Sequence, residues 1–157
     1  MKSYLFNEKE RKRSAMNIKI IANYTKLTVA TEGAIKEYGK RLSRYCKFSF
    51  LSLKKEKDIA KHLSPSTSIF MITTSKQTIS SEELADTIKT LGLTGHSDVV
   101  FFVDFSYETI SSFVEETQAI TSTSISSLSF STALTVAVLS EQIYRAYRIM
   151  NGEPYHK

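Results

Sequence analysis

Residues Asp98–Val103 (DVVFFV) constrain the fold of this chain more than any other segment, because every position after the first is apolar. A strand in which polar and apolar residues do not alternate must be covered on both of its faces. Such strands are typical of parallel sheets that carry helices on each side. We therefore expect residues 98–103 to form the central strand of an α/β sheet.

Strands and helices are expected to alternate along the rest of the chain. Short β-branched or alternating apolar runs predict strands, whereas apolar residues at spacings of three and four predict helices. One helix opens with a capping-box pattern, Ser80 followed by Glu83. The expected strands are 17–22, 47–53, 68–73, 98–103 and 124–130, and the expected helices are 29–45, 54–62, 80–91, 107–119 and 131–150. This order predicts a mostly parallel sheet with helices on both faces.

The last of these helices, residues 131–150, is apolar nearly all round in its first half. We expect such a helix to be buried on more than one side. A dimer interface would provide that burial.

The first fifteen residues differ in composition from the rest of the chain. They carry five basic and two acidic residues, in a protein with a net charge of +5. We interpret them as a basic extension and residues 16–157 as one domain, since 157 residues with 41% hydrophobic content suit a single core. The extension has two open interpretations: an arm that touches RNA, or a disordered or non-native segment before a true start at Met16.

The single cysteine, Cys46, excludes an intrachain disulfide and is typical of a reducing compartment. No apolar run approaches the roughly 18 to 20 residues of a membrane span, and the N-terminus lacks the apolar core of a secretory signal. We therefore expect a cytoplasmic protein without a membrane partner.

A search for catalytic groups finds few candidates. The three histidines are scattered and no Cys/His cluster has metal-ligand spacing, so we expect no metal. The five glycines form no phosphate-binding pattern, which disfavours a nucleotide-binding Rossmann enzyme. Asp104 follows the expected central strand, at the edge where open α/β sheets bind ligands. Its alternative role is to form a turn.

The C-terminal segment Glu141–Lys157 is dense in aromatic and basic side chains. Tyrosine and histidine stack on nucleobases, and arginine and lysine meet phosphates, so the segment could face RNA. In the alternative interpretation its tyrosines belong to the core, its arginines are solvated and its tail is frayed. The residues alone leave both interpretations open.

The order of residues in this segment (EQIYRAYRIMNGEPYHK) closely resembles the C-terminus of the RlmH family. These are SPOUT-class methyltransferases that modify a pseudouridine at N3 in large-subunit ribosomal RNA. Weaker resemblances are found in Glu37–Leu42 (EYGKRL), Ser80–Leu84 (SSEEL) and Ser97–Phe101 (SDVVF). The resemblance covers nearly all of residues 16–157 and excludes residues 1–15.

The resemblance implies a homodimeric α/β domain with a C-terminal trefoil knot, whose S-adenosylmethionine pocket lies beside the partner's surface. It also implies that Tyr155 and His156 are catalytic and that Arg145, Arg148 and Lys157 contact RNA. The cofactor-binding positions that it implies are Met71, Asp104, Phe105, Ser129, Phe130 and Leu134. The implied partners are a second copy of the chain and RNA or the ribosome.

The resemblance fails at the cofactor pocket. The family has a glycine-rich turn after its knot-leading strand, whereas this chain has Asp104–Glu108 (DFSYE). Side chains there would fill space that a ligand needs, and residues other than glycine resist a positive φ. Three other family features are altered: a Gly-Lys pair appears as Ser75-Lys76, a Phe-Pro-His segment as residues 130–132, and an arginine as Val136.

Two functions from different classes follow. The first is N3-methylation of a pseudouridine in 23S rRNA, with S-adenosylmethionine as the cofactor. The second is a non-catalytic paralogue that keeps the dimer and RNA or ribosome contact but has lost the cofactor pocket. Phe105 or Tyr107 inside the knot cavity would mean that the pocket is closed. A third, blander possibility is a protein-interaction dimer that reuses the fold.

Overall fold

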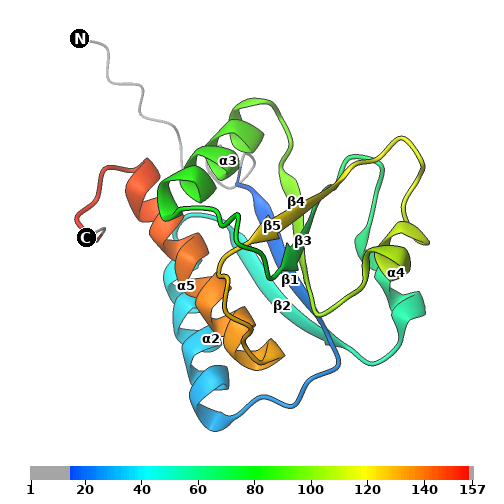
Figure 1. The fold of residues 1–157 in the computed structure, drawn as a ribbon. Helices are drawn as coiled ribbons and strands as arrows, with labels where there is room; N and C mark the ends of the chain where they lie inside the picture. The colour runs from blue at the N-terminus through cyan, green and yellow to red at the C-terminus, as the bar shows by residue number, and fades with distance from the viewer. Residues whose placement is uncertain (1–14, 156–157) are drawn as a thin grey trace.

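A five-stranded sheet with helices on both faces forms the body of the protein (Figure 1). The computed structural model describes residues 15–155, so the predicted extension, apart from Ala15, and the last two residues lie outside the described part. Along the chain the elements are β1 (Asn17–Asn23), α2 (Val29–Leu42), β2 (Lys47–Leu53), the 3-10 helix η1 (Glu56–His62), β3 (Ser68–Thr73), α3 (Ser81–Leu93), β4 (Asp98–Val103), α4 (Tyr107–Ser111), β5 (Ile120–Ser124) and α5 (Thr132–Met150). None of the described helices is long and apolar enough to cross a membrane.

The strand order is β2-β1-β4-β3-β5, and every neighbouring pair is parallel. β4 therefore occupies the centre, as its apolar sequence predicts. The carboxyl ends of the strands lie along one edge: Val103 of β4 is paired with Ala22 of β1 and with Ile72 of β3. The expected parallel α/β sheet is thus confirmed, while the trefoil knot stays a prediction.

Two hydrophobic clusters cover the two faces of the sheet. Val99, Phe101 and Val103 of β4 join the cluster formed with α2, α3 and α5. Val100 and Phe102 point the other way and pack in the cluster that includes residues of η1 and α4. All five side chains are at most 3% exposed, so β4 is covered on both faces.

Each of the three long helices begins at a hydroxyl side chain that accepts a hydrogen bond from the helix's first turn. Ser80 and Glu83 form the predicted capping box at α3, with the backbone N–H of Ser80 donating to the Glu83 carboxylate at 2.7 Å. Thr28 and Thr31 form an equivalent pair at α2, which was not predicted from the sequence. Ser131 caps α5 by accepting from Leu134 N–H at 3.3 Å.

The apolar first half of α5 is covered mainly within the chain. The helix packs against both α2 and α3, with Val136 and Leu139 at most 1% exposed. Its burial alone therefore does not require a dimer. Leu134 is the exception, with 43% of its surface exposed near the start of the helix.

The region between β4 and α5 differs from the prediction. The helix expected over residues 107–119 stops at Ser111, and the strand expected over 124–130 is instead Ile120–Ser124. The Gln118 side chain donates to the backbone carbonyls of Ser64 and Thr67 at 2.9 and 2.7 Å, which holds residues 112–119 in turns. β5 then pairs in parallel with β3 as an edge strand, where threonine side chains are well suited to the pleat.

Candidate functional site

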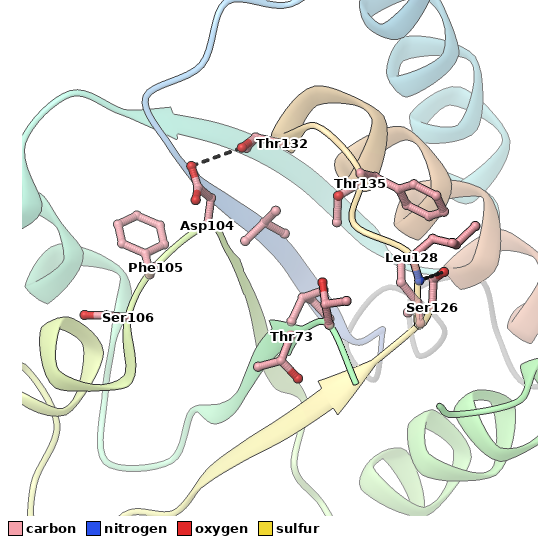
Figure 2. A pocket seen from close by; sticks show the side chains of 13 residues that line it. Thr73, Asp104, Phe105, Ser106, Ser126, Leu128, Thr132 and Thr135 are labelled. Atoms are coloured by element: carbon pink, nitrogen blue, oxygen red, sulfur yellow. Dashed lines mark hydrogen bonds between the residues drawn. The ribbon is translucent and has the colours of Figure 1, made fainter. Parts of the chain in front are cut away.

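A pocket of about 450 Å³ opens at the carboxyl ends of β3 and β4 (Figure 2). Its walls come from these strand ends, from the loop after β5 and from the first turn of α5. The volume falls within the roughly 300 to 1,000 Å³ of small-molecule sites. The location is also the edge at which open α/β sheets bind ligands.

The walls of the pocket combine apolar and polar chemistry. Ile72 and Val103 supply apolar surface, and hydroxyl groups come from six lining residues: Thr73, Thr74, Ser106, Ser126, Thr132 and Thr135. The first turn of α5 also carries backbone N–H groups with a partial positive charge, which favours an anionic group of a ligand. The pocket therefore suits a molecule with an apolar ring and several hydrogen-bonding groups.

Asp104 forms the turn that leaves β4. Its φ of 63° lies in the left-handed region, which aspartate tolerates better than most residues with side chains. The Asp104 carboxylate accepts a hydrogen bond from Thr132 Oγ1 at 3.0 Å, which joins the end of β4 to the start of α5. The turn expected to need glycine therefore forms here with aspartate.

Phe105 and Tyr107 do not close the pocket. The Phe105 ring packs edge-on against Phe102, with ring centroids 5.5 Å apart and an interplanar angle of 85°, so it belongs to the core on the α4 side of the sheet. Phe105 contributes to the rim across the pocket from Thr135 (Figure 2). Tyr107 is 52% exposed and does not line the pocket.

Ser124 holds together the two loops that border the pocket. Its hydroxyl accepts from Ser75 N–H at 3.0 Å and donates to the Ser126 carbonyl at 2.9 Å. Its own carbonyl accepts from Ile79 N–H at 2.8 Å. Neither this residue nor the wall hydroxyls were predicted from the sequence, because small polar residues at the ends of elements form no motif. The signal that could have found them is their position directly after or before predicted strands and helices.

The six predicted cofactor-binding residues are divided between the pocket and other places. Asp104, Phe105 and Phe130 line it. Met71 is 8% exposed and packs in the cluster on the α4 face, while Ser129 and Leu134 are exposed and are not part of the lining. Their contact with a cofactor stays a prediction.

The C-terminal tail folds back on α5. The Tyr155 ring packs edge-on against Tyr144 at 5.0 Å, and its hydroxyl donates to Glu141 at 3.1 Å. The Arg145 guanidinium lies 4.9 Å from the centre of the Tyr155 ring. Burial, together with hydrogen bonds to Tyr38 and Glu141, raises the pKa of Tyr155 above its ordinary value of 10.0, so the phenol is protonated at neutral pH. The predicted His156 and Lys157 lie outside the described residues.

Arg145 and Arg148, the arginines predicted to contact RNA, are paired with carboxylates. Arg145 bonds Glu141 at 2.9 Å, and Arg148 bonds Glu153, which also accepts from the Tyr45 hydroxyl at 2.9 Å. Only 23% and 17% of the two arginine side chains are exposed. RNA contact by either residue stays a prediction, and it would compete with an existing ion pair.

The pocket and the tail lie at different places along α5. Thr132 lines the pocket, whereas Tyr155 bonds Glu141, nine residues further on. At 1.5 Å of rise per residue, these two positions are about 14 Å apart along the helix axis. One chain therefore does not bring its own Tyr155 into its own pocket in this arrangement.

Cys46 is buried at the opposite end of the sheet, beside Tyr147. Burial raises the pKa of its thiol from 9.0 to about 12, and burial together with Cys46 also raises the pKa of Tyr147. The reactive thiolate is therefore roughly 1,000-fold scarcer at pH 8 than in an ordinary cysteine. We expect an aromatic disulfide reagent at pH 8 to react with folded Cys46 at least 100-fold more slowly than with the denatured chain.

The same shift predicts how stability depends on pH. The folded state holds the proton of the Cys46 thiol more tightly than the unfolded state does. The contribution of this thiol to the free energy of unfolding is therefore complete below about pH 9 and is lost as pH rises toward 12. Denaturant titrations should show a falling free energy of unfolding above pH 9. In the experiment with the disulfide reagent, equal reaction rates for the folded and the denatured protein would contradict a buried Cys46 thiol.

Comparisons with known proteins agree on one family. The family model described as "Predicted SPOUT methyltransferase" matches residues 16–156. The protein "Ribosomal RNA large subunit methyltransferase H 1" of Thermoanaerobacter sp. (strain X514) is 38% identical over 142 residues, covering 90% of this chain and 100% of the relative. Proteins named "Ribosomal RNA large subunit methyltransferase H" from Clostridium novyi (strain NT) and Clostridium botulinum (strain Loch Maree / Type A3) are 35% and 33% identical, with the same coverage.

Proposed function

This chain belongs to the RlmH family of SPOUT methyltransferases, and from that premise we propose that it methylates N3 of a pseudouridine in 23S ribosomal RNA with S-adenosylmethionine as the methyl donor. The observation that carries the proposal is the open pocket at the carboxyl ends of β3 and β4. The loss of glycine at the turn after β4 predicts that side chains would fill this space. The space is nevertheless open, which favours a chain that still binds the cofactor. A ribosomal RNA substrate is also consistent with the expected cytoplasmic location.

The residues present fit S-adenosylmethionine. Ile72 and Val103 offer apolar surface to its adenine, and the hydroxyls of Thr73 and Thr135 offer hydrogen bonds. The Asp104 carboxylate, which accepts from Thr132 at the start of α5, would accept hydrogen bonds from hydroxyl or amino groups of the cofactor. When bound, this cofactor supplies an electrophilic methyl group on sulfur.

The tail residues would handle the proton of the target base. Methylation at N3 replaces the N3–H proton, so a group must accept it as the new N–CH₃ bond forms and the old S–CH₃ bond breaks. Tyr155 is held protonated, and its hydroxyl, which donates to Glu141 in the structure, would turn to the base to donate a hydrogen bond that orients it. Histidine has an ordinary pKa near 6.5, so His156 is the tail residue suited to accept the proton at neutral pH.

A homodimer would bring a tail to each pocket. The separation of about 14 Å along α5 keeps Tyr155 from the pocket of its own chain. Three exposed apolar side chains lie on or beside the pocket rim: Leu128 at 69%, Phe130 at 36% and Leu134 at 43% exposure. We propose that a second copy covers this apolar rim and presents its own tail there.

Titration calorimetry with S-adenosylmethionine tests the cofactor part of the proposal. We expect a dissociation constant in the micromolar range, because the pocket is open and the relatives are methyltransferases. Methyl transfer to large ribosomal subunits that lack the modification, followed by mapping of the modified base, tests the reaction. Absence of binding at millimolar cofactor would overturn the proposal and favour the non-catalytic paralogue.

A further inference from the structure

An exposed tyrosine lies between lysines at the same edge of the sheet as the pocket. Tyr24 directly follows β1 and is 60% exposed, and the Lys54 ammonium lies 5.7 Å from the centre of its ring. We propose that Tyr24 and Lys54 form a nucleotide subsite, in which the ring stacks on a base next to the target and the ammonium meets a phosphate. The inference rests on the proposed function, since it assumes that the target base meets the methyl donor at the mouth of the pocket.

The register of the sheet places this pair close to the pocket. Asn23 is paired with Leu53, so Tyr24 and Lys54 leave neighbouring strands at the same level. Ala22 is paired with Val103, so the end of β1 also lies beside the turn at Asp104. Adjacent strands are about 4.8 Å apart, which puts Tyr24 roughly one strand and Lys54 roughly two strands from that turn. Nucleotides flanking a base at the mouth of the pocket would pass over these two side chains.

The tyrosine is held in position by backbone contacts. The N–H of Tyr24 donates to the Asn23 side chain at 2.9 Å, and the N–H of Thr25 donates to Ser52 Oγ at 3.1 Å. The second bond ties the segment after β1 to strand β2, which carries Lys54 at its end. Because the backbone at Tyr24 is already held, the chain loses little backbone freedom when a base stacks on the ring.

The lysines around Tyr24 are available to phosphates. Lys26, Lys54, Lys55 and Lys57 are exposed, and none of them forms an ion pair with the part of the chain that the structure describes. The nearby Asp58 is already paired with Lys61 at 2.9 Å. Lys55 and Lys57 interact electrostatically with Asp58, so Lys26 and Lys54 are the cations most available to a polyanion.

The distribution of charge over residues 16–140 favours approach from this side. Residues 16–62, which form β1, α2, β2 and η1, contain eleven basic and four acidic residues. Residues 63–140 contain two basic and eight acidic residues. The β2 end of the sheet is thus positive and the β5 end negative, so RNA that reaches the pocket should extend over β1 and β2.

Matched substitutions test the subsite. We expect Tyr24→Ala to weaken RNA binding about 10-fold and Tyr24→Phe to leave it nearly unchanged, because stacking needs the ring and not the hydroxyl. Lys54→Ala should lower the slope of log affinity against log salt by about one. Tyr107→Ala and Lys89→Ala serve as controls, since both residues are exposed on the acidic part of the chain and should not alter RNA affinity.

RNA affinity is measured by fluorescence with a fragment of 23S rRNA, and methyl transfer by its KM and kcat. Calorimetry measures cofactor affinity, and sedimentation measures the mass of the dimer. The subsite predicts a raised KM for RNA at unchanged cofactor affinity and unchanged dimer mass. Unchanged RNA affinity in Tyr24→Ala overturns the inference, and so does a loss in Tyr24→Phe as large as in Tyr24→Ala. Dissociation of the Tyr24→Ala dimer also overturns it, because Tyr24 would then be a contact between copies.

The two proposals can fail separately. Wild-type protein that binds RNA in a Tyr24-dependent manner but transfers no methyl group would keep the subsite and overturn the enzyme. Wild-type protein that methylates RNA without any effect of Tyr24→Ala would keep the enzyme and overturn the subsite. Wild-type protein that neither binds nor methylates the fragment or the ribosomal subunit would overturn both.

Discussion

Replacing Thr135 with tryptophan is expected to weaken S-adenosylmethionine binding at least 100-fold and to abolish methyl transfer. Thr135 lies in the first turns of α5 and lines the pocket (Figure 2). An indole at this position would occupy the space between α5 and the ends of β3 and β4. A 100-fold loss corresponds to about 2.7 kcal/mol of binding free energy. Titration calorimetry measures it directly.

The control for this variant is Thr135→Ser, which keeps the hydroxyl bond to the Ser131 carbonyl and leaves the pocket open. It should bind the cofactor like the wild type. Thermal unfolding of both variants checks that the tryptophan protein is folded. A folded Thr135→Trp protein with wild-type affinity would show that the cofactor binds elsewhere.

The fold was largely predictable because its core elements carry strong local signals. The unbroken apolar sequence of β4 predicts a strand covered on both faces, and it lies at the centre of a parallel sheet. The capping box of Ser80 and Glu83 locates the start of α3. The segment from α4 to β5 was predicted wrongly, because its conformation depends on tertiary bonds such as those of Gln118. A serine- and threonine-rich stretch gives no periodic pattern from which to place an edge strand.

The site was only partly predictable, because part of it also depends on tertiary contacts. Asp104 could be identified from its position after β4, since ligands bind at that edge of an α/β sheet. The sequence could not show that the pocket stays open without glycine at this turn. That outcome depends on the hydrogen bond from Thr132 and on where the Phe105 ring packs. The exposure of Tyr24 can be known only from the structure. In the sequence Tyr24 follows a buried strand and could equally have been a core residue.

Replacing Leu134 with glutamate is expected to convert a dimer into monomers and to lower methyl transfer at least 100-fold. Leu134 is 43% exposed in the first turn of α5, four residues after Phe130, which lines the pocket. A partner that covers this part of the surface would bury an unpaired carboxylate. Burial of an unpaired charge costs several kcal/mol. Sedimentation at micromolar protein concentration measures the change in mass. Leu93→Glu, at a leucine that is 78% exposed on α3, is the matched control and should remain dimeric.

Mixing two inactive variants determines whether each site combines residues of two chains. Thr135→Trp lacks a pocket but keeps Tyr155, whereas Tyr155→Ala keeps the pocket but lacks the tail phenol. In a heterodimer, the intact pocket of one chain would meet the intact tail of the other. Random exchange makes half of the dimers mixed, and each contains one complete site out of two, so activity should return to about one quarter of the wild-type rate. Recovery of no activity after exchange would mean that each pocket uses the tail of its own chain, which would require Tyr155 to leave its bond to Glu141 and move about 14 Å along α5.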